Sequence, residues 1–125
     1  MKLYHFTSDY AAALIQETGE LRPALHGVLG RSFVWLTSTR SPKPSELGLS
    51  RGRKKVNRMV HRFEVETDIA VPWSSVRSEF SDWGVSFLES APGAKPEIWY
   101  VSGNALPISS QQPSRIEGAL PHMQR

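Results

Sequence analysis

The sequence predicts a compact α+β fold in which two short helices pack on a mixed or antiparallel sheet. Stretches rich in β-branched and aromatic residues alternate with stretches that favour helices, in the order strand, helix, strands, helix, strands. A length of 125 residues suits one domain with a substantial core and is too short for two. Hydrophobic residues make up 39% of the chain and charged residues 22%, so we expect most of it to fold.

The first half of the chain begins with a predicted strand at 3–7. Ser8 or Asp9 then provides an N-cap, because its side-chain oxygen can accept from the open amides of the first helical turn. Helix-forming residues follow from Tyr10 to Ile15, and Gly19 is the expected C-terminal stop. We expect an extended segment from Leu21, a loop at 23–30 and a buried aromatic strand at 32–39.

The second half begins with a long loop at 40–55 that contains proline and glycine and has room for one helical turn at 45–47. The remaining predictions follow in chain order: a half-exposed strand at 56–65, a helix at 72–80 that starts with proline, a turn or short strand at 82–89, a loop at 91–96, a strand at 97–102 and an edge strand at 105–108. We expect one domain over 1–108 and a loosely ordered tail over 109–125.

The composition excludes several classes of site. The chain has no cysteine, which rules out a disulfide framework, a thiolate nucleophile and a cysteine-based zinc site. No set of His, Asp and Glu has metal-ligand spacing, so we expect no metal. No apolar run approaches the roughly 18 residues of a membrane span, and no signal peptide opens the chain. We therefore expect a cytoplasmic protein with no membrane partner.

The positive charge is concentrated in one part of the sequence. The formal net charge is +3, and a single block holds six of the basic residues: Arg51, Arg53, Lys54, Lys55, Arg58 and Arg62. One interpretation of this block is a solvated loop. The other is contact with the phosphates of a nucleic acid or of an anionic cofactor, with Arg51, Arg53, Lys54 and Lys55 as the substrate-binding residues.

Three short motifs carry the candidate chemistry, and each also has a simpler structural interpretation. The first strand reads Tyr-His-Phe-Thr-Ser around His5, which fits either a ligand contact or a histidine satisfied by a nearby carbonyl. The aromatic strand ends in the hydroxyl residues Thr37, Ser38 and Thr39, which also suit an ordinary strand edge. The segment Pro-Glu-Ile-Trp-Tyr-Val places Glu97 at the start of a late strand, where a solvated carboxylate is equally common.

In this order the three motifs resemble the ADP-ribosyltransferase fold. The opening, with its short helix and its Gly-Glu-Leu-Arg-Pro continuation at 19–23, looks most like the small DarT-like branch and related phage or toxin transferases. The motifs also resemble the RNA 2′-phosphotransferases, which share the NAD-binding scaffold. The resemblance extends from Met1 to about Ile108, although each motif is short.

The resemblance implies a role for each motif. His5 would bind the ribose of NAD, with Phe6 and Thr7 beside it, and Glu97 would hold the 2′-hydroxyl of the nicotinamide ribose as the catalytic residue. The nicotinamide-ribose pocket would be lined by Trp35, Thr37, Ser38 and Thr39. Many members have a tyrosine that stacks on nicotinamide in the second motif, where this chain has Trp35 and Thr37.

Elementary chemistry is compatible with these roles. Cleavage of the nicotinamide–ribose bond develops positive charge at the anomeric carbon, and a nearby carboxylate stabilises that charge. The hypothesis is therefore an NAD-dependent ADP-ribosyltransferase that acts on a macromolecule, either nucleic acid (DNA or RNA) or protein. The alternatives are a non-catalytic module on the same fold that binds nucleic acid or protein, such as a phage inhibitor or toxin–antitoxin component, and an enzyme like the RNA 2′-phosphotransferases.

Overall fold

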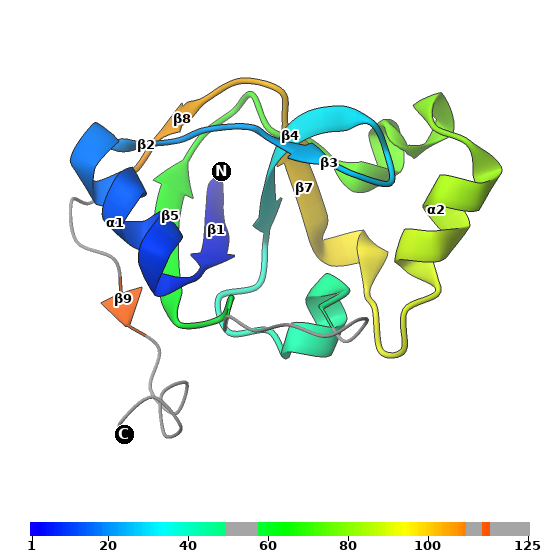
Figure 1. Ribbon diagram of the computed structural model, residues 1–125, viewed down its shortest axis with the longest axis horizontal. Helices are drawn as coiled ribbons and strands as arrows, with labels where there is room; N and C mark the ends of the chain where they lie inside the picture. Colours follow the sequence, from blue (N-terminus) through cyan, green and yellow to red (C-terminus); the bar gives the residue numbers. More distant parts are fainter. Residues whose placement is uncertain (50–57, 110–113, 116–125) are drawn as a thin grey trace.

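The computed structural model describes residues 1–49, 58–109 and 114–115 (Figure 1). Two α-helices, α1 (Asp9–Thr18) and α2 (Asp82–Glu89), accompany four short 3-10 helices: η1 (Pro44–Leu47), η2 (Trp73–Ser75), η3 (Arg77–Glu79) and η4 (Pro96–Ile98). The strands are β1 (Lys2–Thr7), β2 (Glu20–Leu21), β3 (Ala24–His26), β4 (Arg31–Thr37), β5 (His61–Glu66), β6 (Val71–Pro72), β7 (Trp99–Ser102), β8 (Leu106–Pro107) and β9 (Ser114–Arg115).

The main sheet has the strand order β6-β7-β4-β1-β5-β9, and β3 pairs with β4 outside this path. All of its pairings are antiparallel. β1 lies between β5, with which it pairs from Lys2↔Glu66 to Thr7↔His61, and β4, with which it shares the pair Tyr4↔Thr37. A small α+β fold with two α-helices and an antiparallel sheet is therefore confirmed.

Helix α1 begins and ends as its sequence predicts. The Ser8 side chain accepts from the Ala11 amide at 3.4 Å, and Gly19 adopts φ 77° while its amide donates to the Ile15 carbonyl at 2.7 Å. Between these caps, Ala12 and Ile15 are buried against the sheet. The helix thus follows directly from β1 and covers one face of it.

Side chains of β4 alternate between two cores on opposite faces of the sheet. Val34 and Leu36 belong to an aliphatic core with Leu3, Ile15, Leu21, Phe63, Val65 and Leu106. Phe33 belongs to an aromatic core with Trp73, Val85, Trp99 and Val101, against which Trp35 packs. In Figure 1, α1 and the β2–β8 pair lie at one end of the molecule and α2 at the other.

Two buried indoles of the aromatic core donate hydrogen bonds that hold the surrounding segments. The Trp73 Nε1–H donates to Glu89 Oε2 at 2.6 Å, and the Trp99 Nε1–H donates to the Glu46 carbonyl at 2.8 Å. These bonds tie α2 and η1 to the core, because burying an indole N–H without an acceptor would be costly.

Two predictions in the region 72–89 are wrong. Residues 82–89 form helix α2 and not a turn or short strand, with Ser81 accepting from the Gly84 amide at 3.0 Å as N-cap. The pattern was misleading because Trp83, 67% exposed, and Phe87 stack on the outer side of this helix, while Gly84 and Val85 face inward. The helix expected at 72–80 is instead the pair η2 and η3, which turns the chain around the buried Trp73.

Several other boundaries also differ from the sequence prediction. The expected loop at 23–30 contains β3, which forms a hairpin with β4, and the strand expected at 32–39 ends at Thr37. Glu97 lies in η4 and not in the following strand, which begins at Trp99. In the predicted tail, Ser114 and Arg115 pair with β5 as β9, whereas 110–113 and 116–125 lie outside the described residues. The domain boundary at 108 stays a prediction.

The edge strand at 105–108 and the helical turn at 45–47 are confirmed as β8 and η1. In β8, Pro107 pairs with Glu20 of β2 in a separate two-stranded sheet. Within the described residues, no helix is long and apolar enough to cross a membrane.

The β3–β4 turn provides a stability test with its own control. Gly30 has φ +71° and its amide donates to the His26 carbonyl at 2.8 Å, whereas Gly27 has an ordinary φ, and a Cβ at either position would meet no atom within 4 Å. We expect Gly30→Ala to lower the free energy of unfolding by about 1–2 kcal/mol, because an L-residue is strained in the left-handed region. Gly27→Ala should leave it nearly unchanged; equal effects in urea denaturation would contradict the assignment.

Candidate functional site

The candidate site lies where β4 ends beside the start of β7. Thr37 pairs with Trp99, and one residue further on the Ser38 amide donates to the Ile98 carbonyl at 3.2 Å. This contact places the segment Ser38–Thr39 next to Glu97. The side chains of Ser38 and Glu97 are exposed and that of Thr39 is half-buried, and these residues directly follow β4 or precede β7, two neighbouring strands inside the sheet.

Glu97 is positioned by the loop that precedes it. The Lys95 amide donates to the Glu46 carbonyl at 3.0 Å, and the Lys95 ammonium lies 3.2 Å from a Glu46 carboxylate oxygen. The hydrogen bonds of Glu46 with Lys43 and Lys95 lower the pKa of its carboxyl group. Since Trp99 also donates to the Glu46 carbonyl, η1 fixes both ends of the segment that carries Glu97.

His5 is hydrogen-bonded to β4 from β1, on the side of β4 opposite β7. It lies in β1 opposite Phe63, half-buried, and its Nδ1–H donates to the Trp35 carbonyl at 2.8 Å. Because a carbonyl can only accept, the bond assigns the proton of the neutral ring to Nδ1 and leaves a lone pair on Nε2. Burial lowers the pKa of His5, and the bond to Trp35 offsets this only in part. At neutral pH the ring is therefore an uncharged acceptor.

The structure therefore brings the three motifs to β4 and its neighbours, but by separate contacts. His5 is bonded to Trp35, and Ser38 to Ile98 beside Glu97. Within the described residues, no hydrogen bond joins His5 directly to Ser38, Thr39 or Glu97.

The remaining residues of the predicted pocket differ in their accessibility. Thr37 is 1% exposed and its Oγ1 accepts from the Thr39 amide at 3.2 Å, so its hydroxyl shapes the turn after β4. Thr7 is also buried, and Phe6 is half-buried opposite Arg62.

Trp35 is half-buried within the aromatic cluster, with its ring centroid 5.4 Å from that of Trp73 and 6.1 Å from that of Trp99. Its Nε1–H is buried and has no hydrogen-bond partner among the described residues, unlike the indoles of Trp73 and Trp99. The predicted role of Trp35 stays a prediction.

The predicted substrate-binding residues, Arg51, Arg53, Lys54 and Lys55, lie outside the described residues. Arg62, from the same basic block, is described: its Nη1–H donates to the Arg40 carbonyl at 3.3 Å. This contact brings the start of β5 to the segment that follows Thr39. The two residues are 22 positions apart in the chain, so the contact could not be anticipated from local sequence.

A second contact that the sequence did not reveal joins His61 to Asp9. The Nε2 of His61 lies 2.5 Å from an Asp9 carboxylate oxygen, while its Nδ1 is buried with no partner among the described residues. The pair fastens the first turn of α1 to β5. Nothing in the sequence links positions 52 residues apart, although Thr7↔His61 pairing explains the proximity once β1 and β5 are aligned.

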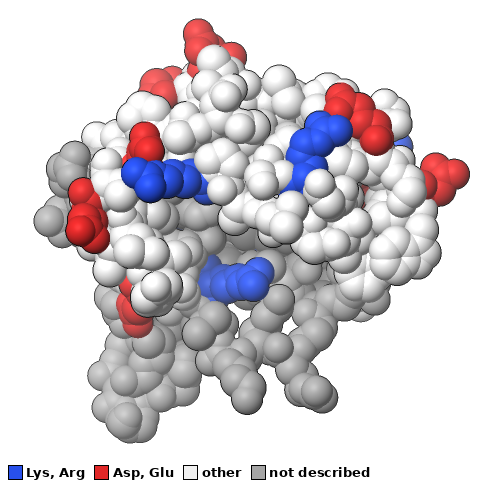
Figure 2. Space-filling model, turned by 45° about the horizontal axis from the view of Figure 1, so that its top comes forward, with Lys and Arg blue, Asp and Glu red and all other residues white. Residues whose placement is uncertain are grey.

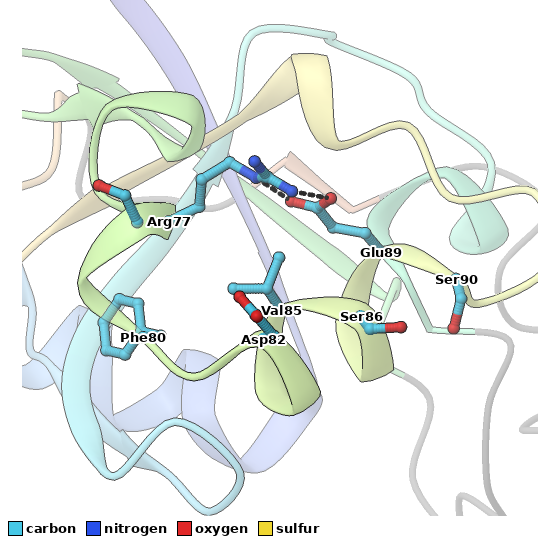
Figure 3. A pocket seen from close by; sticks show the side chains of 8 residues that line it. Arg77, Phe80, Asp82, Val85, Ser86, Glu89 and Ser90 are labelled. Atoms are coloured by element: carbon cyan, nitrogen blue, oxygen red, sulfur yellow. Dashed lines mark hydrogen bonds and ion pairs between the residues drawn. The ribbon is translucent and has the colours of Figure 1, made fainter.

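A cavity of about 570 Å³ lies elsewhere, between η3 and α2 (Figure 3). Its lining contains none of the predicted site residues: it consists of Arg77, Ser78, Phe80, Asp82, Val85, Ser86, Glu89 and Ser90. Arg77 donates to both carboxylate oxygens of Glu89 at 2.7 and 2.8 Å, which raises the pKa of Arg77 and lowers that of Glu89. Glu89 also accepts from Trp73, so Arg77 and Glu89 already stabilise the fold.

Comparison with protein-family models, curated proteins and solved structures gives no match for the chain. Among the described residues, no group of three His, Cys, Asp or Glu side chains could hold a metal ion. The functional interpretation therefore rests on the geometry around Ser38, Glu97 and His5.

The environment of His5 predicts how stability depends on pH. A buried ring with a lowered pKa binds fewer protons in the folded state than in the unfolded chain, whose pKa is near 6.5. The free energy of unfolding should therefore fall as the pH drops below about 6.5. In His5→Asn this fall should be smaller, because Asn keeps a donor near the Nδ1 position but does not titrate.

Urea denaturation at pH 8 and pH 5.5 measures both effects. The pKa of His26 is also lowered, by burial and by Arg58, so a residual pH dependence of the same sign should persist in His5→Asn. An identical change between the two pH values in both proteins would show that His5 does not contribute.

Proposed function

We propose that this protein is an NAD-dependent transferase that moves ADP-ribose to a macromolecule, nucleic acid or protein. The observation that carries the proposal is the contact between the Ser38 amide and the Ile98 carbonyl, which brings the backbone of Ser38 to the residue after Glu97. The neutral His5, held by the Trp35 carbonyl of the same strand β4, adds an acceptor. These are the groups that a ribose with its several hydroxyls requires.

The proposed reaction breaks the bond between the anomeric ribose carbon and nicotinamide, which leaves as a neutral molecule with the bonding electron pair. Positive charge develops on the ribose, and the Glu97 carboxylate stabilises it through the ribose hydroxyls. An oxygen or nitrogen of the target then forms the new bond to the anomeric carbon. The proton released by the target passes to Glu97 or to solvent.

The other residues bind and orient in this proposal. The lone pair on His5 Nε2 accepts from a sugar hydroxyl, and Ser38 and Thr39 offer hydroxyls from the turn after β4. Because the turn is fixed by Thr37 and by Ile98, these groups are positioned before the ligand arrives, which lowers the entropic cost of orienting it.

Glu97→Gln tests the proposal, because it removes the charge and keeps the shape. We expect nicotinamide release from NAD, measured with a lysate as source of target, to fall by about 10²- to 10⁴-fold. Glu17→Gln is the matched control, since Glu17 is an exposed carboxylate on α1, away from β7. It should retain full activity and the same circular dichroism spectrum.

Two outcomes would reject the proposed transferase activity. In the first, the wild-type protein neither binds NAD in calorimetry nor releases nicotinamide. In the second, Glu97→Gln and Glu17→Gln are equally active. NAD binding without any release would instead favour a non-catalytic module.

A further inference from the structure

The described lysines and arginines divide into two groups by their surroundings. Five of them form ion pairs with carboxylates at 2.7–3.5 Å: Lys2 with Glu64, Arg22 with Glu20, Arg31 with Glu79, Arg77 with Glu89 and Lys95 with Glu46. Lys43 is close enough to Glu46 to lower the pKa of that carboxyl group. Over most of the described surface, positive charge is therefore neutralised locally.

The exceptions are three arginines, Arg40, Arg58 and Arg62. None of them forms an ion pair within the described part of the chain; in the sequence, Arg58 and Arg62 follow the segment 50–57 and Arg40 precedes it. On the face shown in Figure 2, two blue side chains in the upper part lie beside red ones. Of these three, Arg40 and Arg62 are in direct contact through the Arg40 carbonyl.

Arg62 is the most informative of the three, because it is half-buried without a counter-ion. Its one hydrogen bond within the described residues goes to the Arg40 carbonyl, a neutral acceptor that leaves its charge uncompensated. Glu64, two residues along the same strand, instead forms an ion pair with Lys2 at 3.5 Å. The hydrogen bond places the Arg62 guanidinium against the Arg40 backbone, and a partly buried guanidinium without a counter-ion is unfavourable unless it binds an anion.

We propose that Arg40 and Arg62 form a binding site for phosphate esters. The guanidinium group has five N–H donors in a planar fork, and Arg62 uses one of them, so the rest can engage phosphate oxygens. Two kinds of ligand carry such phosphate groups: a dinucleotide, through its diphosphate, and a nucleic acid, through its phosphodiesters. Since Arg40 directly follows Ser38–Thr39, either source would lie next to the candidate site.

The proposal does not depend on the transferase activity and is tested by equilibrium binding. Calorimetry with inorganic diphosphate, ADP-ribose and a single-stranded oligonucleotide is compared for the wild type, Arg40→Gln and Arg62→Gln. Arg22→Gln is the control, because it removes the same charge from an arginine paired with Glu20. Arg40→Gln keeps the carbonyl that Arg62 binds, so it remains informative even if Arg62→Gln unfolds.

We expect Arg40→Gln and Arg62→Gln to weaken diphosphate binding by about tenfold each, as for the loss of one charge-assisted hydrogen bond. A parallel loss with ADP-ribose identifies the dinucleotide as the source. A loss with the oligonucleotide, together with a salt slope smaller by about 0.7 per contact, identifies the phosphodiester. Either result supports the site.

The proposal is overturned if the wild type binds none of the three probes. It is also overturned if the Arg40 and Arg62 variants bind as tightly as the wild type, or if Arg22→Gln weakens binding as much as they do. Because nicotinamide release plays no part in these measurements, failure here is distinct from failure of the transferase.

Discussion

The arrangement of the strands depends on Thr37 of β4, which pairs with a neighbouring strand on each side. It pairs with Tyr4 of β1 and with Trp99 of β7, it is almost completely buried, and its hydroxyl accepts from the Thr39 amide. A one-residue slip in either pairing would turn the β4 side chains to the wrong face and exchange the two cores. The same residue fixes where β4 ends and therefore where Ser38 is presented.

The aromatic core links this strand pairing to the position of the Glu97 carboxylate. Trp99, which pairs with Thr37, also donates to the Glu46 carbonyl, and Glu46 in turn holds Lys95 just before Glu97. The position of the exposed Glu97 is thus set by contacts that its neighbours Lys95 and Trp99 make with Glu46. This division between a rigid support and an accessible group is what binding and catalysis require of a scaffold.

Sequence patterns predicted the elements whose signals are local. The caps at Ser8 and Gly19, the buried aromatic strand and the proline-marked edge at Pro107 all follow from neighbouring residues. Helix α2 was missed because its exposed Trp83 and Phe87 imitate the apolar residues of a strand. The contacts of His61 with Asp9 and of Arg62 with Arg40 depend on strand alignment, which no local pattern encodes.

The two outer strands of the main sheet also affect how this molecule associates with other chains. On one side, β6 has two residues and ends at Pro72, which has no amide hydrogen to offer. On the other side, β9 pairs with His61 and Arg62 of β5, and the Ser109 amide donates to the Glu64 carbonyl. In the described residues, each outer strand is only two residues long and offers little template to a foreign strand, which opposes amyloid-like stacking of a sheet rich in aromatic residues.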